Sequence, residues 1–85
     1  MSHMVYSKLN ATSTDGVISV GNHTDAIYFL NTNYEDYVQV ELNGGPHVVV
    51  LRKHSKDHEY SQFIGDYTSF RVLTAGAIVA VYAVG

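Results

Sequence analysis

The residues best suited to metal chemistry lie together in one short segment. In HSKDHE, His54 and His58 are four positions apart, and Asp57 and Glu59 flank the second histidine. On a helix this spacing would direct both imidazoles toward one zinc ion. The segment has the composition of a loop, where spacing alone does not orient ligands, and the chain has no cysteine to add a thiolate. We therefore expect neither a bound metal nor another cofactor.

Other catalytic combinations are also missing from the sequence. A cupin-type metal site needs an H-x-H pair, a glutamate and a distant histidine, whereas the expected strands carry single histidines such as His47. No cysteine nucleophile and no G-x-S-x-G motif is present. Glu35 and Asp36 are adjacent in a loop and should point apart, while a glycosidase needs two carboxylates across a cleft. We predict that the protein is not an enzyme and has no catalytic residues.

Positive charge is concentrated in the segment RKHSK, which holds three of the five Lys and Arg residues, Arg52, Lys53 and Lys56. The strands show no interleaving of aromatic and basic residues, and the formal net charge is −3, so we expect no nucleic-acid partner. We predict a charged loop that docks on an acidic partner, or one that keeps a sheet edge soluble. Acidic residues in or beside other loops provide the opposite charge: Asp25, Glu35, Asp36 and Glu41.

Tyrosine is over-represented, with seven copies in 85 residues. Tyr34 and Tyr37 bracket the two acidic residues of one loop, and Tyr60 and Tyr67 flank the segment SQFIGD. Exposed tyrosines stack on sugar rings and also anchor protein interfaces. These four tyrosines are therefore candidate ligand or interface residues. The simpler alternative is that they fill half-buried positions at strand edges.

The C-terminal segment LTAGAIVAVYAVG, residues 73–85, has no charged side chain and predicts a strand that is buried on both faces. Alternation assigns one face to Ile78, Ala80, Tyr82 and Val84. The opposite face would present Ala77, Val79, Val81 and Ala83. An exposed face of alanine and valine is prone to aggregation. We expect a loop of the same chain or a partner to cover this second set, and we predict it as the partner interface.

Turn-forming residues recur about every eight to twelve positions, which is the spacing of an all-β sandwich or barrel. Turns or loops are expected at 14–16, 21–25, 32–36, 43–46, 52–59 and 65–68. The segment YVQVEL, residues 37–42, has the clearest alternation of apolar and polar residues. No segment of ten or more residues has the apolar period of a helix. The sequence predicts an all-β fold, a compact sandwich or jelly roll of about eight short antiparallel strands.

The length of 85 residues indicates one domain, expected at residues 5–85. Residues 1–4 are expected to be a tag remnant or a disordered N-terminus, because SHM at 2–4 resembles a cloning scar. Without cysteine, so small a domain is most readily stabilised by oligomerisation. The low charged fraction, 15%, also favours large protein contacts. No apolar stretch approaches about 18 residues and the N-terminus lacks the apolar core of a signal peptide, so we expect no membrane partner.

Small size, absence of cysteine, Gly/Asn turns and the final apolar segment FRVLTAGAIVAVYAVG occur together in this chain. In this overall character it resembles the capsid cement or decoration proteins of tailed bacteriophages. The resemblance implies a non-enzymatic homo-oligomer, often a trimer, that binds the major shell protein. It also implies synthesis in the host cytoplasm and a final location on the capsid surface of the virion. The alternative is a carbohydrate-binding module or phage fibre-tip domain that uses the tyrosine-rich loops.

Overall fold

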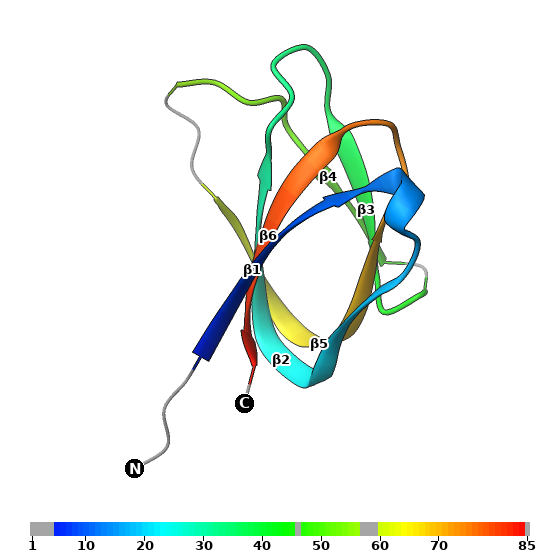
Figure 1. Ribbon diagram of the computed structural model, residues 1–85, viewed down its shortest axis with the longest axis vertical. Helices are drawn as coiled ribbons and strands as arrows, with labels where there is room; N and C mark the ends of the chain where they lie inside the picture. The colour runs from blue at the N-terminus through cyan, green and yellow to red at the C-terminus, as the bar shows by residue number, and fades with distance from the viewer. Residues whose placement is uncertain (1–4, 46, 57–59, 85) are drawn as a thin grey trace.

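The computed structural model describes residues 5–45, 47–56 and 60–84, and it confirms the all-β class. The strands and the one short 3₁₀ helix follow in the order β1 (Val5–Thr12), η1 (Ser13–Asp15), β2 (Ile18–Asn31), β3 (Val38–Leu42), β4 (His47–Leu51), β5 (Ser61–Val72) and β6 (Ala77–Val84) (Figure 1). No helix in these ranges is long and apolar enough to span a membrane. The predicted tag remnant at residues 1–4 lies outside the described residues.

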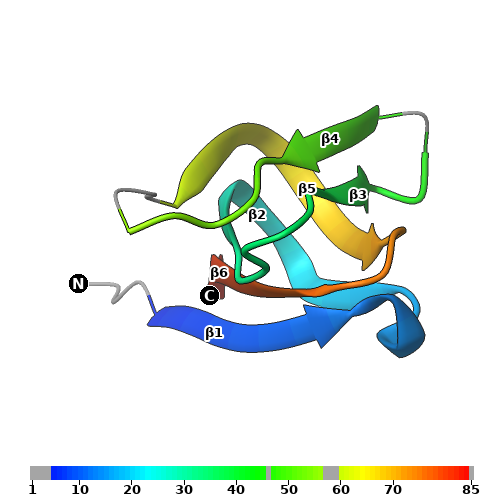
Figure 2. The ribbon, with the colours of Figure 1, turned by 90° about the horizontal axis from the view of Figure 1, so that it is seen from above.

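Within the described ranges, the six strands pair into one antiparallel sheet in the order β1-β6-β2-β5-β3-β4. The sheet bends, so that β1 and β6 lie on one side of the molecule and β3 and β4 lie on the other (Figure 2). The sandwich or jelly roll of the prediction is not confirmed, because its strands would divide between two sheets. The long strands β2 and β5 run through both halves and connect them.

The described residues form six strands where the sequence predicted about eight, because two predicted turns lie inside strands. The segments 21–25 and 65–68 belong to β2 and β5, which stay paired while their register shifts between Ser19 and Thr24 and again before Ala26. Gly21 lies within the first shift and has a φ of +92°. Glycine and asparagine serve β-bulges as well as turns, and a bulge bends a strand without ending it. Here the bulged region bends the sheet around the core.

The core lies inside the bend and contains the residues that alternation predicted. Val38, Val40 and Leu42 of β3 are fully buried. The rings of Phe29 and Phe70 pack edge to face with centroids 5.3 Å apart, and Phe70 lies 6.3 Å from Tyr82. The second contact joins β5 to β6, which are not neighbours in the sheet. The two halves of the bent sheet therefore pack against each other around one core.

Candidate protein-binding face

The C-terminal strand β6 has one fully buried face and one half-buried face. Ile78, Ala80 and Tyr82 point into the core, and the most exposed of them, Tyr82, retains 5% of its surface. The predicted interface residues alternate with these and are each half-buried: Ala77, Val79, Val81 and Ala83. Of the two covers predicted for this second face, the chain itself supplies only a part, and cover by a partner stays a prediction. Within the described residues, neighbouring side chains cover these four only in part.

The neighbouring strands extend this surface. Tyr6, Lys8 and Asn10 of β1 lie opposite Ala83, Val81 and Val79. On the other side of β6, Tyr28 and Leu30 of β2 lie opposite Val81 and Val79. We call the surface at the outward positions of β1, β6, the second half of β2 and the start of β5 the outer face. Its apolar members are Tyr6, Ala26, Tyr28, Leu30, Ile64, Ala77, Val79, Val81 and Ala83.

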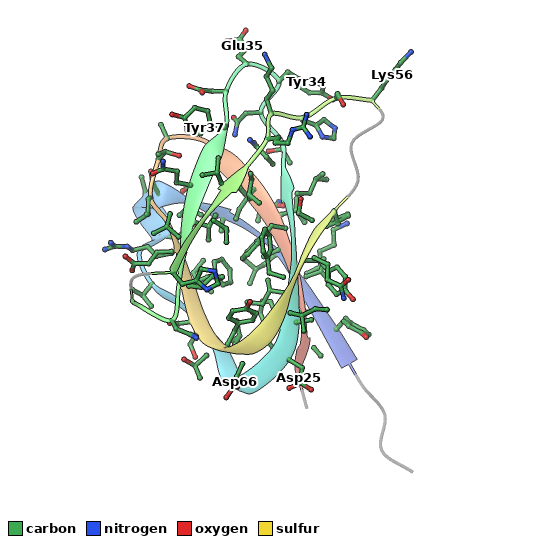
Figure 3. All side chains as sticks on the ribbon, turned by 180° about the vertical axis from the view of Figure 1, so that it is seen from behind. Asp25, Tyr34, Glu35, Tyr37, Lys56 and Asp66 are labelled. Atoms are coloured by element: carbon green, nitrogen blue, oxygen red, sulfur yellow. The ribbon has the colours of Figure 1, made fainter. Side chains whose placement is uncertain are left out.

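Two members of the outer face are strongly exposed although they are large and apolar. Ile64 retains 76% of its surface and Tyr6 retains 56%. Among the described outward residues of β1 and β6, Lys8 is the one charged side chain, and the exposed Asp25 and Asp66 of β2 and β5 lie together at one end of the molecule (Figure 3). A contiguous apolar surface with so little charge is typical of a site for protein contact. The outer face is thus a candidate interface that is wider than the four residues of β6.

A shallow hollow of about 310 Å³ opens on the outer face and is lined by Lys8, Tyr28, Tyr60 and Val81. We call it the outer hollow. Three of its residues follow one row of the sheet, because Val81 pairs with Lys8 on one side and with Tyr28 on the other. The amide Nε2 of Gln62 donates a hydrogen bond to the Tyr28 hydroxyl at 2.9 Å. In that bond the Tyr28 hydroxyl oxygen is the acceptor, so the hydroxyl proton of Tyr28 can be donated to a ligand.

At one end of the molecule, the tip loop (residues 32–37) is fastened to the sheet by a buried asparagine. Asn31 has no exposed surface, and its Nδ2 donates to the carbonyls of Asp36 at 3.0 Å and Leu51 at 3.3 Å. Its Oδ1 accepts hydrogen bonds from the backbone N–H and from Nδ2 of Asn33, both at 2.8 Å. One side chain thereby satisfies polar groups at both ends of the tip loop and at the end of β4.

The tip loop presents two of the predicted tyrosines to solvent. Tyr34 retains 69% of its surface and Tyr37 retains 52%. The ring of Tyr34 packs edge to face on the imidazole ring of His54, with the ring centroids 4.8 Å apart. The backbone N–H of His54 donates a hydrogen bond to the backbone carbonyl of Asn33 at 2.7 Å. These contacts place the segment after β4 beside the tip loop. Figure 3 shows Tyr34, Glu35 and Tyr37 at this end and Asp25 and Asp66 at the other.

The structure separates the other two predicted tyrosines. Tyr60 lines the outer hollow and is 39% exposed, so it remains accessible to a partner. The prediction is wrong for Tyr67, which retains only 4% of its surface. Its hydroxyl donates to the Ile64 carbonyl at 3.1 Å, and its ring lies so close to Gly65 that a Cβ there would come within 2.8 Å. Tyr67 is therefore a core residue whose hydroxyl is satisfied by its own strand.

The basic residues predicted as a docking loop lie in an irregular segment, as expected. Arg52, Lys53 and Lys56 follow β4 and are all exposed. Through His54 this segment contacts the tip loop, so basic residues and the acidic pair Glu35–Asp36 share one end of the molecule. Of the other acidic residues, Glu41 lies 3.5 Å from Arg71 in an ion pair between β3 and β5. Glu41 therefore lies within a strand and links two neighbouring strands, and it is not part of a loop.

Among the described residues, no three side chains of His, Asp or Glu come together as a metal site. Asp57, His58 and Glu59 lie outside the described residues, so the histidine cluster of the sequence has no structural test. No sequence pattern points to Lys8, Tyr28 or Asn31 as site residues. Alternation alone predicts that Tyr28 points to the other side of its strand from Ile27 and Phe29. Its proximity to Lys8 depends on the pairing of strands that are distant in sequence. Asn31 gives no sequence signal beyond its place at a strand end.

Comparison with known proteins provides no assignment for the chain. No protein-family model matches it, and neither a curated protein nor a solved structure is significantly similar to it.

Proposed function

We propose that the protein is a non-enzymatic structural protein that self-associates and binds a protein shell, as a capsid cement or decoration protein of a tailed bacteriophage does. The observation that carries the proposal is the outer face, where apolar residues from four strands surround Lys8. Its exposed residues Tyr6 and Ile64 gain most from burial by a partner. The resemblance of the sequence supports the shell as the second partner and a trimer as the first oligomer to consider.

The exposed basic loop supports the shell-binding part of the proposal. Arg52, Lys53 and Lys56 are exposed and lie outside the strands of the outer face, and Lys56 projects from one end of the molecule (Figure 3), so contact through the outer face leaves this segment available to a different partner. An acidic shell surface would attract them over the screening distance of about 8–10 Å at physiological salt. The two surfaces thus have separate roles: the outer face binds other copies of the chain, and the basic loop binds the shell.

Replacing Arg52, Lys53 and Lys56 together with serine should weaken shell binding by about tenfold, since each exposed charge contributes modestly. Binding is measured by co-sedimentation with capsid shells that lack a decoration protein, at low and high salt. The unmodified protein should lose affinity as salt rises, and the triple variant should respond less. If the variant and the unmodified protein bind equally at every salt concentration, the loop has no role in docking.

The test of self-association uses Val81→Lys, which places a charge in the centre of the outer face. Val81 points away from the core, so the variant should fold and its native mass by light scattering should fall toward that of one chain. Val50→Lys is the matched control, because Val50 is 55% exposed on β4 in the other half of the sheet. A folded Val81→Lys protein that keeps the full native mass would contradict the proposed interface.

The tip loop supports a second candidate function, carbohydrate binding by a module or fibre-tip domain. Tyr34 and Tyr37 are exposed, and Asn31 fixes the loop that carries them, so their rings are held ready to stack on sugars. Carboxylates of Glu35 and Asp36 are close enough in sequence to accept hydrogen bonds from sugar hydroxyls. A glycan array probed with the unmodified protein and with Tyr34→Ala tests this function. Only binding that the variant loses would support it.

A further inference from the structure

We infer that the tip loop of a second copy docks in the outer hollow, with its Glu35 carboxylate facing Lys8. The inference rests on the proposed function, because it names the contact by which copies associate. It is carried by two features of the described residues that complement each other. One is a hollow lined by the side chains of Lys8, Tyr28 and Tyr60, and the other is a loop that carries Glu35 between Tyr34 and Tyr37 in the sequence.

The outer hollow offers hydrogen-bond donors to a ligand. The Lys8 ammonium is a donor only, and Lys8 is exposed on the edge strand β1. The Tyr28 hydroxyl oxygen already accepts a hydrogen bond from Gln62, so its proton points elsewhere. Tyr60 adds a second hydroxyl, while Val81 provides an apolar floor. A carboxylate on an apolar stem fits this combination of a cation, two hydroxyls and aliphatic surface.

The tip loop presents a carboxylate of that kind. Asp36 is engaged within the loop, since its Oδ1 accepts the Tyr37 N–H at 2.9 Å. Glu35 is exposed and projects from the end of the molecule, and Lys56 points away from it (Figure 3). Tyr34 and Tyr37 on either side supply apolar area that could cover the exposed residues around the hollow. Because Asn31 holds both ends of the loop, docking loses little loop entropy.

The positions of the two features define the type of contact. The hollow lies on the flank of the bent sheet, and the tip loop lies at one end of the molecule. Two different patches therefore meet: a pair of copies that makes this contact once has a heterologous interface, and a pair that makes it twice is a two-fold dimer. Repetition of a heterologous contact gives a ring if the rotation closes, and a trimer is the smallest ring of this kind. Carbohydrate binding by the same tyrosines would compete with such a ring.

Charge exchange tests the contact. Lys8→Glu and Glu35→Lys should each raise the dissociation constant of self-association by about tenfold or more, because each brings like charges together. The double variant Lys8→Glu/Glu35→Lys restores an opposite pair and should recover most of the lost affinity. Native mass is measured by light scattering over a concentration series, and thermal unfolding verifies that each variant is folded. Val50→Glu and Val50→Lys control for the added charge, and both should associate normally.

The outcomes separate this inference from the proposed function. If the unmodified protein associates and Val81→Lys abolishes association, but both single charge variants associate normally, the outer face binds some other surface and the inference is wrong. Weakening by both single variants without recovery in the double variant also contradicts it, since the two charges then act in separate places. A protein that never associates would overturn the proposed function itself.

Discussion

Replacing Phe29 with alanine is expected to lower the free energy of unfolding by about 3–5 kcal/mol, the range for removing a fully buried phenylalanine. Phe29 has no exposed surface and lies in β2, between β6 and β5 at the centre of the sheet. Its ring centroid lies 5.8 Å from that of Phe63 and 5.3 Å from that of Phe70. The substitution therefore removes contacts in both halves of the bent sheet and leaves a cavity where they meet.

Urea denaturation followed by circular dichroism measures this loss. Small domains have a total stability of roughly 5–15 kcal/mol, so the variant should be largely unfolded if the unmodified protein lies near the lower limit. Val50→Ala is the control and should change the free energy of unfolding by less than about 0.5 kcal/mol, because Val50 is mostly exposed. A loss below about 1 kcal/mol for Phe29→Ala would mean that the two halves do not share this core.

The second large effect is expected for Asn31→Leu, at about 2–4 kcal/mol of lost stability. The leucine would leave the Leu51 carbonyl without this hydrogen-bond partner at a buried position. It would do the same to the Asp36 carbonyl and the Asn33 backbone N–H at partly buried positions. Unlike Phe29→Ala, this variant should also release the tip loop. We therefore expect faster amide hydrogen exchange in residues 32–37 at denaturant concentrations where the sheet remains folded.

Asn10→Leu is the matched control for Asn31→Leu, because Asn10 is exposed on β1. It should leave both the stability and the exchange of the tip loop unchanged, when measured at low protein concentration. An Asn31→Leu protein with unchanged stability would contradict the role assigned to Asn31. Unchanged exchange in the loop would show that the Tyr34–His54 contact and the His54–Asn33 hydrogen bond are sufficient to hold it.

The sequence was most informative where one strand face contacts the core throughout. Alternation correctly divided buried from outward residues in β3 and in β6 from Ala77 to Ala83, because each of these stretches keeps one face toward the interior. It was least informative at 21–25 and 65–68, where turn-forming residues occur inside bulged strands. Local sequence does not distinguish a turn that ends a strand from a bulge that bends it, since both use the same residue types.

The candidate site shows the same limit at longer range. Lys8, Tyr28 and Val81 form one row of the sheet, yet they are distant in sequence and meet only through the pairing of three strands. Tyr67 shows the reverse case, since its neighbours Asp66 and Thr68 suggested a turn while its own ring fills the core. Residue type and position thus separated the two faces of β6, but strand order was needed to find the hollow beside it.

The central claim is that the outer face holds copies of this chain together, and native mass over a concentration series tests it most directly. One chain has a mass of 9.4 kDa. We predict that light scattering gives a mass that rises with concentration to a fixed multiple of this value, with a trimer as the expected limit. A mass of one chain up to the highest concentration at which the protein stays in solution would contradict the claim.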